Sequence, residues 1–102
     1  MKYYYAMTIF GEMVYFEGVK KSEEKSGCLI LYTPESSFKY SIIDIQSGLH
    51  VRRYKKLKDA KEYFEGEKFI DDLLEIETAR SKDFYKEAKE KMEKFRHEVE
   101  GK

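Results

Sequence analysis

The sequence RRYKKLKDAK, residues 52–61, decides the fold of this chain. The segments before it are short and rich in tyrosine, phenylalanine and isoleucine, which favour strands. The segments after it are rich in lysine and glutamate, which favour helices. A sheet-forming half followed by a helical half, within 102 residues, predicts a single α+β domain spanning residues 1–102.

An antiparallel sheet of four to five strands is predicted for residues of about 2–54. The strand-like segments are residues 3–10, 13–18, 28–33, 38–45 and 49–54. Turn-forming residues or short polar loops separate them, as at Pro34 and Gly48. Sequential strands with such short breaks favour a meander.

The helical part is predicted to cover residues 57–99. Leu57, Ala60 and Phe64 have helical spacing, and Gly66 either ends a short first helix or only weakens the helix there. Residues 67–99 contain neither glycine nor proline, so they form either one long helix or two helices. Two helices would meet near Ser81–Asp83, with Ser81 or Asp83 as N-cap.

Apolar residues recur at helical spacing along this part of the chain and form an apolar stripe in two segments. The first segment is Phe69, Ile70, Leu73, Leu74 and Ile76, and the second is Tyr85, Ala88, Met92, Phe95 and Val99.

The composition limits the class of protein. The chain is 41% hydrophobic, with nine tyrosines and seven phenylalanines, which suffices for a core. A single cysteine, Cys28, excludes an internal disulfide and a cysteine-based zinc site. No membrane-spanning apolar stretch and no signal-peptide pattern is visible, so we expect no membrane association and a cytoplasmic location.

Charge is distributed unevenly although the formal net charge is zero. Residues 52–61 carry six basic side chains and one acidic, a net charge of +5. Residues 62–79 carry one basic side chain and seven acidic, a net charge of −6. The two blocks either neutralise each other in space or leave a local basic patch for an anionic partner.

No catalytic or cofactor motif is apparent. His50 and His97 stand outside any nucleophile motif, and glycine-rich phosphate loops are missing from the sequence. Asp71 and Glu75, at i and i+4 on a helix, could together bind a cation, but this spacing is only a weak indication of a metal site. We therefore expect a protein that is not an enzyme and holds neither a metal nor a cofactor.

Asp44 is unusual because it lies between Ile43 and Ile45 on an apolar strand. A bulge that turns its carboxylate to solvent is the favoured interpretation. If the strand stays in phase, Asp44 shares the face of Ile42 and needs a partner, for which His50 or Arg52 are candidates. An acid–base pair of Asp44 and His50 is the enzymatic alternative.

The basic stretch is the strongest candidate for binding nucleic acid or a nucleotide. Cations with an interleaved aromatic residue suit phosphates and stacked bases. The candidate residues are His50, Arg52, Arg53, Tyr54, Lys55, Lys56 and Lys58. On a regular strand His50, Arg52 and Tyr54 would share one face.

A second candidate surface consists of aromatic residues and the terminal helix. Tyrosine gives large contact area at low entropic cost, so exposed members would suit a protein interface. The candidate interface residues are Tyr3, Tyr4, Tyr5, Tyr85, Met92 and Phe95. Filling of the core is the alternative for at least half of the tyrosines. The terminal helix either packs on the sheet or against residues 69–76, or it forms a homodimer seam.

The leading functional hypothesis is a small non-enzymatic binding protein with a protein partner. Short domains rich in lysine, glutamate and tyrosine are common among phage and mobile-element proteins. One version is therefore a phage-type inhibitor that acts in the host-cell cytoplasm, where it docks on a host macromolecule or sequesters a ligand. The alternative is nucleic-acid or nucleotide binding through residues 50–61.

Overall fold

The fold comes from a computed structural model, which describes residues 4–10 and 12–101, with only the backbone described at residues 9, 10, 12 and 13. The predicted α+β class is confirmed. Five strands precede three helices, and the chain follows the sheet from one edge to the other in the order β1-β2-β3-β4-β5. The strands are β1 (Tyr4–Phe10), β2 (Glu12–Lys20), β3 (Cys28–Tyr32), β4 (Tyr40–Asp44) and β5 (His50–Tyr54).

The helices are α1 (Leu57–Glu65), α2 (Glu67–Arg80) and α3 (Asp83–Glu100). Of the two alternatives at Gly66, the structure has the first, because Gly66 is the C-cap of α1, and residues 67–99 form two helices. The predicted N-cap is wrong: Ser81 is the C-cap of α2, and Lys82 precedes α3 without a side-chain capping bond.

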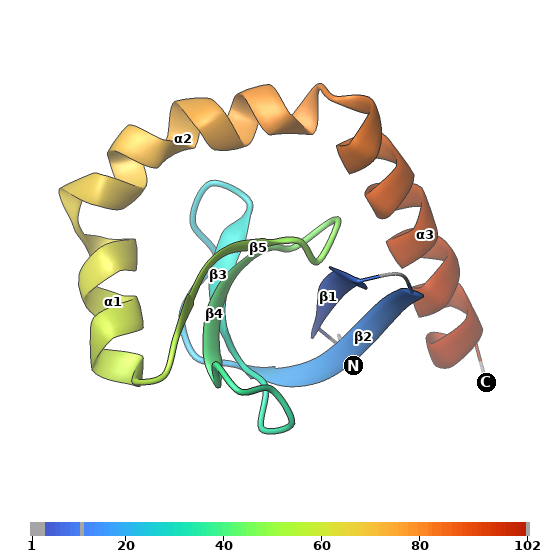
Figure 1. The fold of residues 1–102 in the computed structure, drawn as a ribbon, viewed down its shortest axis with the longest axis horizontal. Coiled ribbons are helices and arrows are strands. Elements are labelled where there is room, and N and C mark those ends of the chain that lie inside the picture. Colours follow the sequence, from blue (N-terminus) through green and yellow to red (C-terminus); the bar gives the residue numbers. More distant parts are fainter. Residues whose placement is uncertain (1–3, 11, 102) are drawn as a thin grey trace.

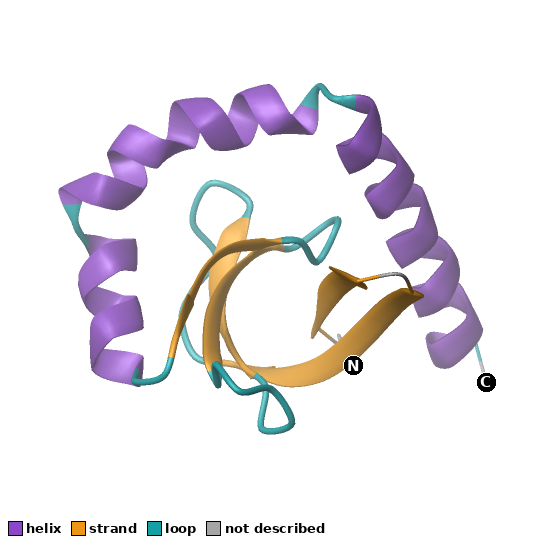
Figure 2. Ribbon diagram, in the orientation of Figure 1, coloured by secondary structure: helices purple, strands orange, loops and turns teal. Residues whose placement is uncertain are grey.

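The sheet curls, and the helices surround its convex side as an arc (Figures 1 and 2). The seam of this curl is joined where the Met7 N–H donates to the Gly48 carbonyl at 2.8 Å. Met7 and Leu49 form an isolated parallel bridge at the same place. All four ladders of the meander are antiparallel.

Alternation along the strands builds a core on both sides of the sheet. One cluster lies inside the curl and consists of Ala6, Leu29, Leu31, Ile43 and Ile45. A second lies beneath α1 and α2 and consists of Cys28, Ile30, Ile42, Ala60, Tyr63, Phe64 and Phe69. A third lies beneath α3 and consists of Tyr5, Met7, Ala88 and Met92. Both faces of the sheet are covered at β3 and β4, so successive side chains of these strands, which point to opposite faces, are mostly buried and mostly apolar.

A bulge interrupts the β4–β5 ladder. Ile42 is opposite Arg52, but Ile43 is opposite His50, so Val51 is the extra residue on β5. Opposite residues of a ladder point to the same side of the sheet. His50 therefore lies on the concave side with Ile43, whereas Arg52 lies on the convex side with Ile42.

Candidate functional site

The basic stretch occupies β5 and the start of α1, and the bulge divides its side chains between two faces. The expectation that His50 shares a face with Arg52 and Tyr54 is wrong, because Val51 shifts the phase of the strand. Arg52 and Tyr54 keep the convex side, opposite Ile42 and Tyr40.

Arg52 pairs with the acidic block. Its Nη2 atom lies 3.1 Å from Asp72 Oδ2 on α2, and its guanidinium stacks 4.9 Å from the centre of the Tyr63 ring. The Tyr63 hydroxyl donates to the same Asp72 oxygen at 2.7 Å. The bond from Tyr63, together with the bonds and charge of Arg52, holds the pKa of Asp72 below its usual value. Arg52 thus helps to hold α2 over β5.

Other cations of the stretch lie free at the surface. Arg53 and Lys55 lie 5.7 and 5.6 Å from the centre of the Phe38 ring, which is 38% exposed. Lys56 and Lys58 are exposed at the start of α1. Within residues 4–10 and 12–101, these four cations have no carboxylate partner. The basic and acidic blocks therefore neutralise each other only in part.

A groove of about 580 Å³ runs along β5. Its lining consists of Phe38, His50, Val51, Arg52, Arg53, Tyr54, Asp72 and Glu75. The carboxylates on α2 make one wall acidic, and the strand supplies the basic wall.

His50 is uncharged at neutral pH. Burial is the main cause that lowers its pKa from 6.5 to about 4, the charge of Arg53 lowers it further, and a hydrogen bond to the Met7 backbone opposes the shift. His50 and Asp44 lie on opposite faces of the sheet, since Asp44 is in phase with Ile42 on β4. The structure does not bring together the acid–base pair considered above.

The predicted aromatic interface residues mostly fill the core. Tyr5, Tyr85 and Met92 are at most 6% exposed, and Tyr4 packs against the cluster inside the curl. Tyr3 lies outside the described residues. The ring of Phe95 stacks on Tyr15 at 4.1 Å and meets Tyr5 edge-on at 4.9 Å. The apolar side of α3 thus packs on β1 and β2.

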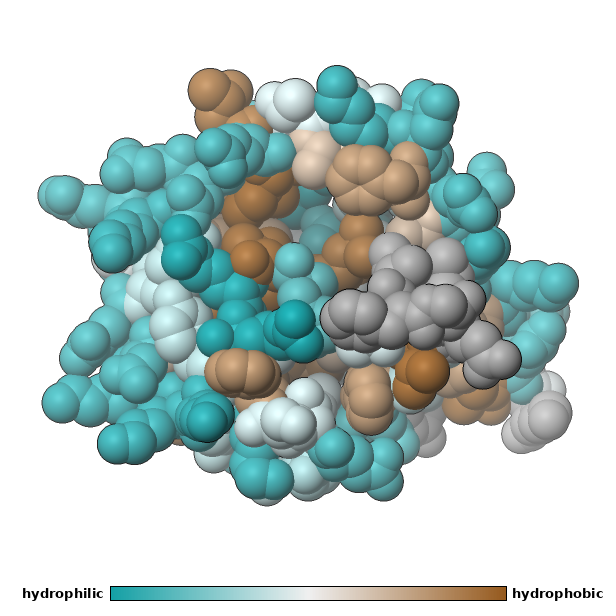
Figure 3. All heavy atoms as spheres, viewed as in Figure 1, coloured by the Kyte–Doolittle hydropathy of each residue, from teal (hydrophilic) through white to brown (hydrophobic). Residues whose placement is uncertain are grey.

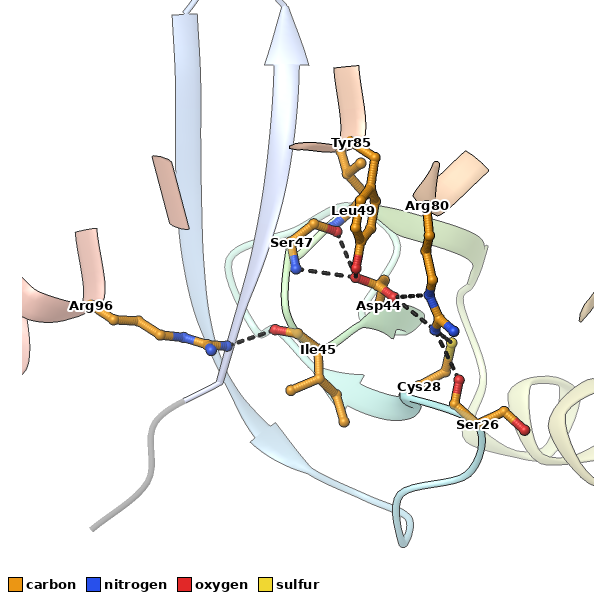
Figure 4. Close-up of polar contacts among 9 residues, drawn as sticks. All are labelled: Ser26, Cys28, Asp44, Ile45, Ser47, Leu49, Arg80, Tyr85 and Arg96. Carbon is orange, nitrogen blue, oxygen red and sulfur yellow. Dashed lines mark hydrogen bonds and ion pairs between the residues drawn. The ribbon is translucent and has the colours of Figure 1, made fainter. Parts of the chain in front are cut away.

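Asp44 is buried and fully hydrogen-bonded (Figure 4). Its Oδ1 atom accepts from Arg80 Nε at 2.9 Å and lies 2.8 Å from Arg80 Nη2. Its Oδ2 atom accepts from the Tyr85 hydroxyl at 2.8 Å, the Ser47 hydroxyl at 2.8 Å and the Ser47 N–H at 3.1 Å. The favoured interpretation, a solvent-exposed Asp44, is wrong, and its partners are not His50 or Arg52.

Sequence reasoning missed Arg80 and Tyr85 as partners of Asp44. The detectable signal was a carboxylate in phase with an apolar face, which requires a buried donor. Which donor it would be depends on how α2 and α3 cross the sheet, 36 and 41 residues further along the chain.

Exposed apolar side chains on the helical arc are a second feature that sequence reasoning missed. Phe69 is buried, but Ile70 and Leu74 are 57% and 73% exposed on α2. Phe84, at the start of α3, is 54% exposed. Figure 3 shows hydrophobic side chains at the outer edge of the molecule over α2, among hydrophilic neighbours. The apolar stripe read from the sequence is therefore divided, with Phe69 in the core and with Ile70 and Leu74 at the surface.

Comparison of the chain with models of protein families, with curated proteins and with solved structures gave no match. None of the described helices is both long enough and apolar enough to cross a membrane. Among the described residues, no three His, Cys, Asp or Glu side chains are grouped as metal ligands would be.

Proposed function

We propose that this protein is a non-enzymatic binding protein that docks on a protein partner through the outer face of α2. The observation that carries the proposal is the exposure of Ile70 and Leu74, at 57% and 73%. Both are large aliphatic side chains, and their i, i+4 spacing places them next to each other on one face of the helix.

The fold itself does not need these two side chains. α2 already contacts the core through Phe69, Leu73 and Ile76, which project from a different side of the helix. A surface helix with one apolar stripe directs that stripe to the core, so a second stripe facing outward indicates a further contact. Phe84, beyond the joint with α3, is a third large apolar side chain that is exposed on the helical arc.

The charged residues around this stripe indicate the charge that the partner's surface should carry. Glu67, Asp71 and Glu77 lie three or four residues from Ile70 or Leu74, and all three are exposed. Lys68 is the exposed cation of this helix. The complementary surface is an apolar groove bordered by lysine and arginine, which receives α2 as an amphipathic helix.

The same charges argue against pairing of α2 with α2 of a second copy, because acidic borders would face each other. They also argue against nucleic acid at this face, because phosphates would meet carboxylates. A basic protein partner is the occupant that fits both the apolar stripe and its border.

The test uses a photo-crosslinking amino acid in place of Leu74, with the same amino acid at Glu90 on α3 as the matched control. The proteins are irradiated in the lysate of a low-GC bacterium, since 16 lysines against 4 arginines suggest an AT-rich coding genome. The crosslinked partner is then purified and titrated with the unmodified protein and with an Ile70→Ala/Leu74→Ala variant.

We expect a discrete adduct from position 74 but not from position 90, and affinity at least about tenfold lower for the double variant. Because both side chains are exposed, the melting temperature of this variant should change little. Equal affinity of the double variant and the unmodified protein for the crosslinked partner would refute the proposal, as would identical adducts from both positions.

A further inference from the structure

We propose that β5 accepts an extended acidic peptide segment as a sixth strand of the sheet. This site is separate from the outer face of α2 and goes beyond the function proposed above. Three observations carry it: an open strand edge, a groove along that edge, and free cations on one side of it.

The open edge follows from the strand order. β5 is the last strand of the meander, so His50–Tyr54 pair with β4 on one side only. Among the described residues, this end of the sheet is linked to β1 by the Met7–Leu49 bridge, the Met7–Gly48 hydrogen bond and a hydrogen bond between the His50 side chain and the Met7 backbone. All three links lie at or before His50. A strand edge offers a row of backbone donors and acceptors to an added strand.

The groove supplies the space. All five residues of β5 line it, and its volume is about 580 Å³. A strand of five residues extends for about 17 Å, so an added segment of that length would follow the whole of β5. Phe38, which also lines the groove, offers an exposed ring for an apolar side chain.

The charges along β5 define the sequence of the added segment. Arg53 is opposite Ser41 and so lies on the concave side of the sheet, where it is exposed and has no carboxylate partner among the described residues. On the other side of the edge, Arg52 is already paired with Asp72, and Glu75 is close by. Alternate side chains of an added strand face these two sides. Acidic residues therefore fit the Arg53 side, and uncharged residues fit the α2 side.

Two features restrict which strands can pair with this edge. The bulge at Val51 displaces the strand locally, and charged side chains on an edge discourage uncontrolled pairing. A segment with acidic residues at alternate positions is attracted by the charge of Arg53, whereas a basic segment is repelled. The edge therefore selects acidic strands.

Single-stranded nucleic acid would use the same cations and would stack on Phe38. The acidic wall formed by Asp72 and Glu75 favours the peptide, because a phosphate backbone carries charge at every residue whereas an alternating peptide presents neutral side chains to that wall.

The experiment measures fluorescence anisotropy of the labelled heptapeptide Glu-Val-Glu-Val-Glu-Val-Glu with blocked ends, at pH 7.5. Four other probes are compared: two versions of the peptide N-methylated at alternate backbone amides, one for each register, the peptide with lysine in place of glutamate, and a ten-residue oligothymidine. Arg53→Glu is the test variant, and Lys94→Glu on α3 is the matched control. Amide exchange at residues 50–54 is followed by NMR with and without the acidic peptide.

We expect saturable binding of the acidic peptide, with at least tenfold weaker binding to Arg53→Glu and unchanged binding to Lys94→Glu. N-methylation in one of the two alternating registers should abolish binding, and amide exchange at residues 50–54 should slow. Absence of binding at millimolar peptide overturns the proposal. Binding that survives N-methylation in both registers also overturns the proposal, because such binding would not use the backbone groups of the strand edge. Tighter, steeply salt-dependent binding of the oligothymidine, lost in Arg53→Glu, would assign the surface to nucleic acid instead.

Discussion

The carboxylate of Asp44 on β4 lies 2.8 Å from the guanidinium of Arg80 at the end of α2. Tyr85, in the first turn of α3, donates to the other oxygen of the same carboxylate at 2.8 Å. One buried side chain thus fixes the ends of two helices against the sheet (Figure 4). The joint between α2 and α3 depends on this contact, because the α3 N-terminus has no side-chain cap.

Substitution of Asp44→Ala should destabilise the protein by about 3–5 kcal/mol. The variant leaves the partly buried guanidinium of Arg80 without its carboxylate and removes the acceptor of the Tyr85 hydroxyl. The free energy of unfolding, measured with urea, checks this. Glu87→Ala, which removes an exposed ion pair with Lys91, is the control and should change stability by less than about 1 kcal/mol. Similar losses in both variants would contradict the role assigned to Asp44.

Acid should destabilise the protein through His50. Its pKa is about 4 in the folded state and 6.5 in the unfolded chain, so the unfolded state binds the proton first as pH falls. The stability present above pH 6.5 is therefore lost progressively down to pH 4, by up to about 3 kcal/mol. His50→Gln should remove this part of the pH dependence in urea titrations, whereas His97→Gln, on the exposed side of α3, should retain it. If the free energy of unfolding depends on pH in the same way in the unmodified protein and in His50→Gln, His50 is not the source of the acid destabilisation.

Gly48→Ala should destabilise the protein by about 2–4 kcal/mol. Gly48 has φ +76°, and an added Cβ would collide with the Met92 side chain and lie 2.8 Å from the Tyr5 carbonyl oxygen. Combination with Met92→Ala should be less destabilising than the sum of the single changes, because the shorter side chain removes one collision. If the loss of stability in the double variant, measured by thermal unfolding, equals the sum of the losses in the two single variants, Met92 does not restrict position 48.

The thiol of Cys28 should report opening of α2. Burial, followed by the charge of Asp44, raises its pKa to about 11, and the residue is 0% exposed. Reaction with a disulfide reagent at pH 8 should be slow in the native state and fast in urea. Arg80→Ala should raise the native rate at least about tenfold, because Arg80 Nη2 lies 3.7 Å from the sulfur. An unchanged rate would mean that Arg80 does not shield the thiol.

Much of the secondary structure could be predicted from local sequence. Period-two patterns and turn residues defined the strands to within a few residues, and Gly66 marked the first helix end. Phe38 was assigned to a strand but precedes β4, since the loop that contains it closes before Tyr40. The N-cap between α2 and α3 was not predictable, because this joint is fixed by Asp44 rather than by a capping side chain.

The candidate surfaces were less predictable. Spacing alone placed Phe69, Ile70 and Leu74 in one apolar stripe, but one face of α2 is wide enough to bury only part of that set. The bulge at Val51 separated His50 from Arg52 because the register of a ladder depends on both strands. Arg52 found its carboxylate on α2, twenty residues away, and not on its neighbours in the chain.

The sequence by itself determined the α+β class, the order of the elements, the alternating core positions and the uneven charge. These follow from properties within a few residues of each other: backbone preferences, side-chain period and turn chemistry. Only the tertiary structure decided that the sheet curls, that Asp44 binds Arg80 and Tyr85, and which apolar and basic side chains remain exposed. Those outcomes depend on how helices 20 to 50 residues further along the chain cross the sheet, and each is set by packing and burial between distant segments.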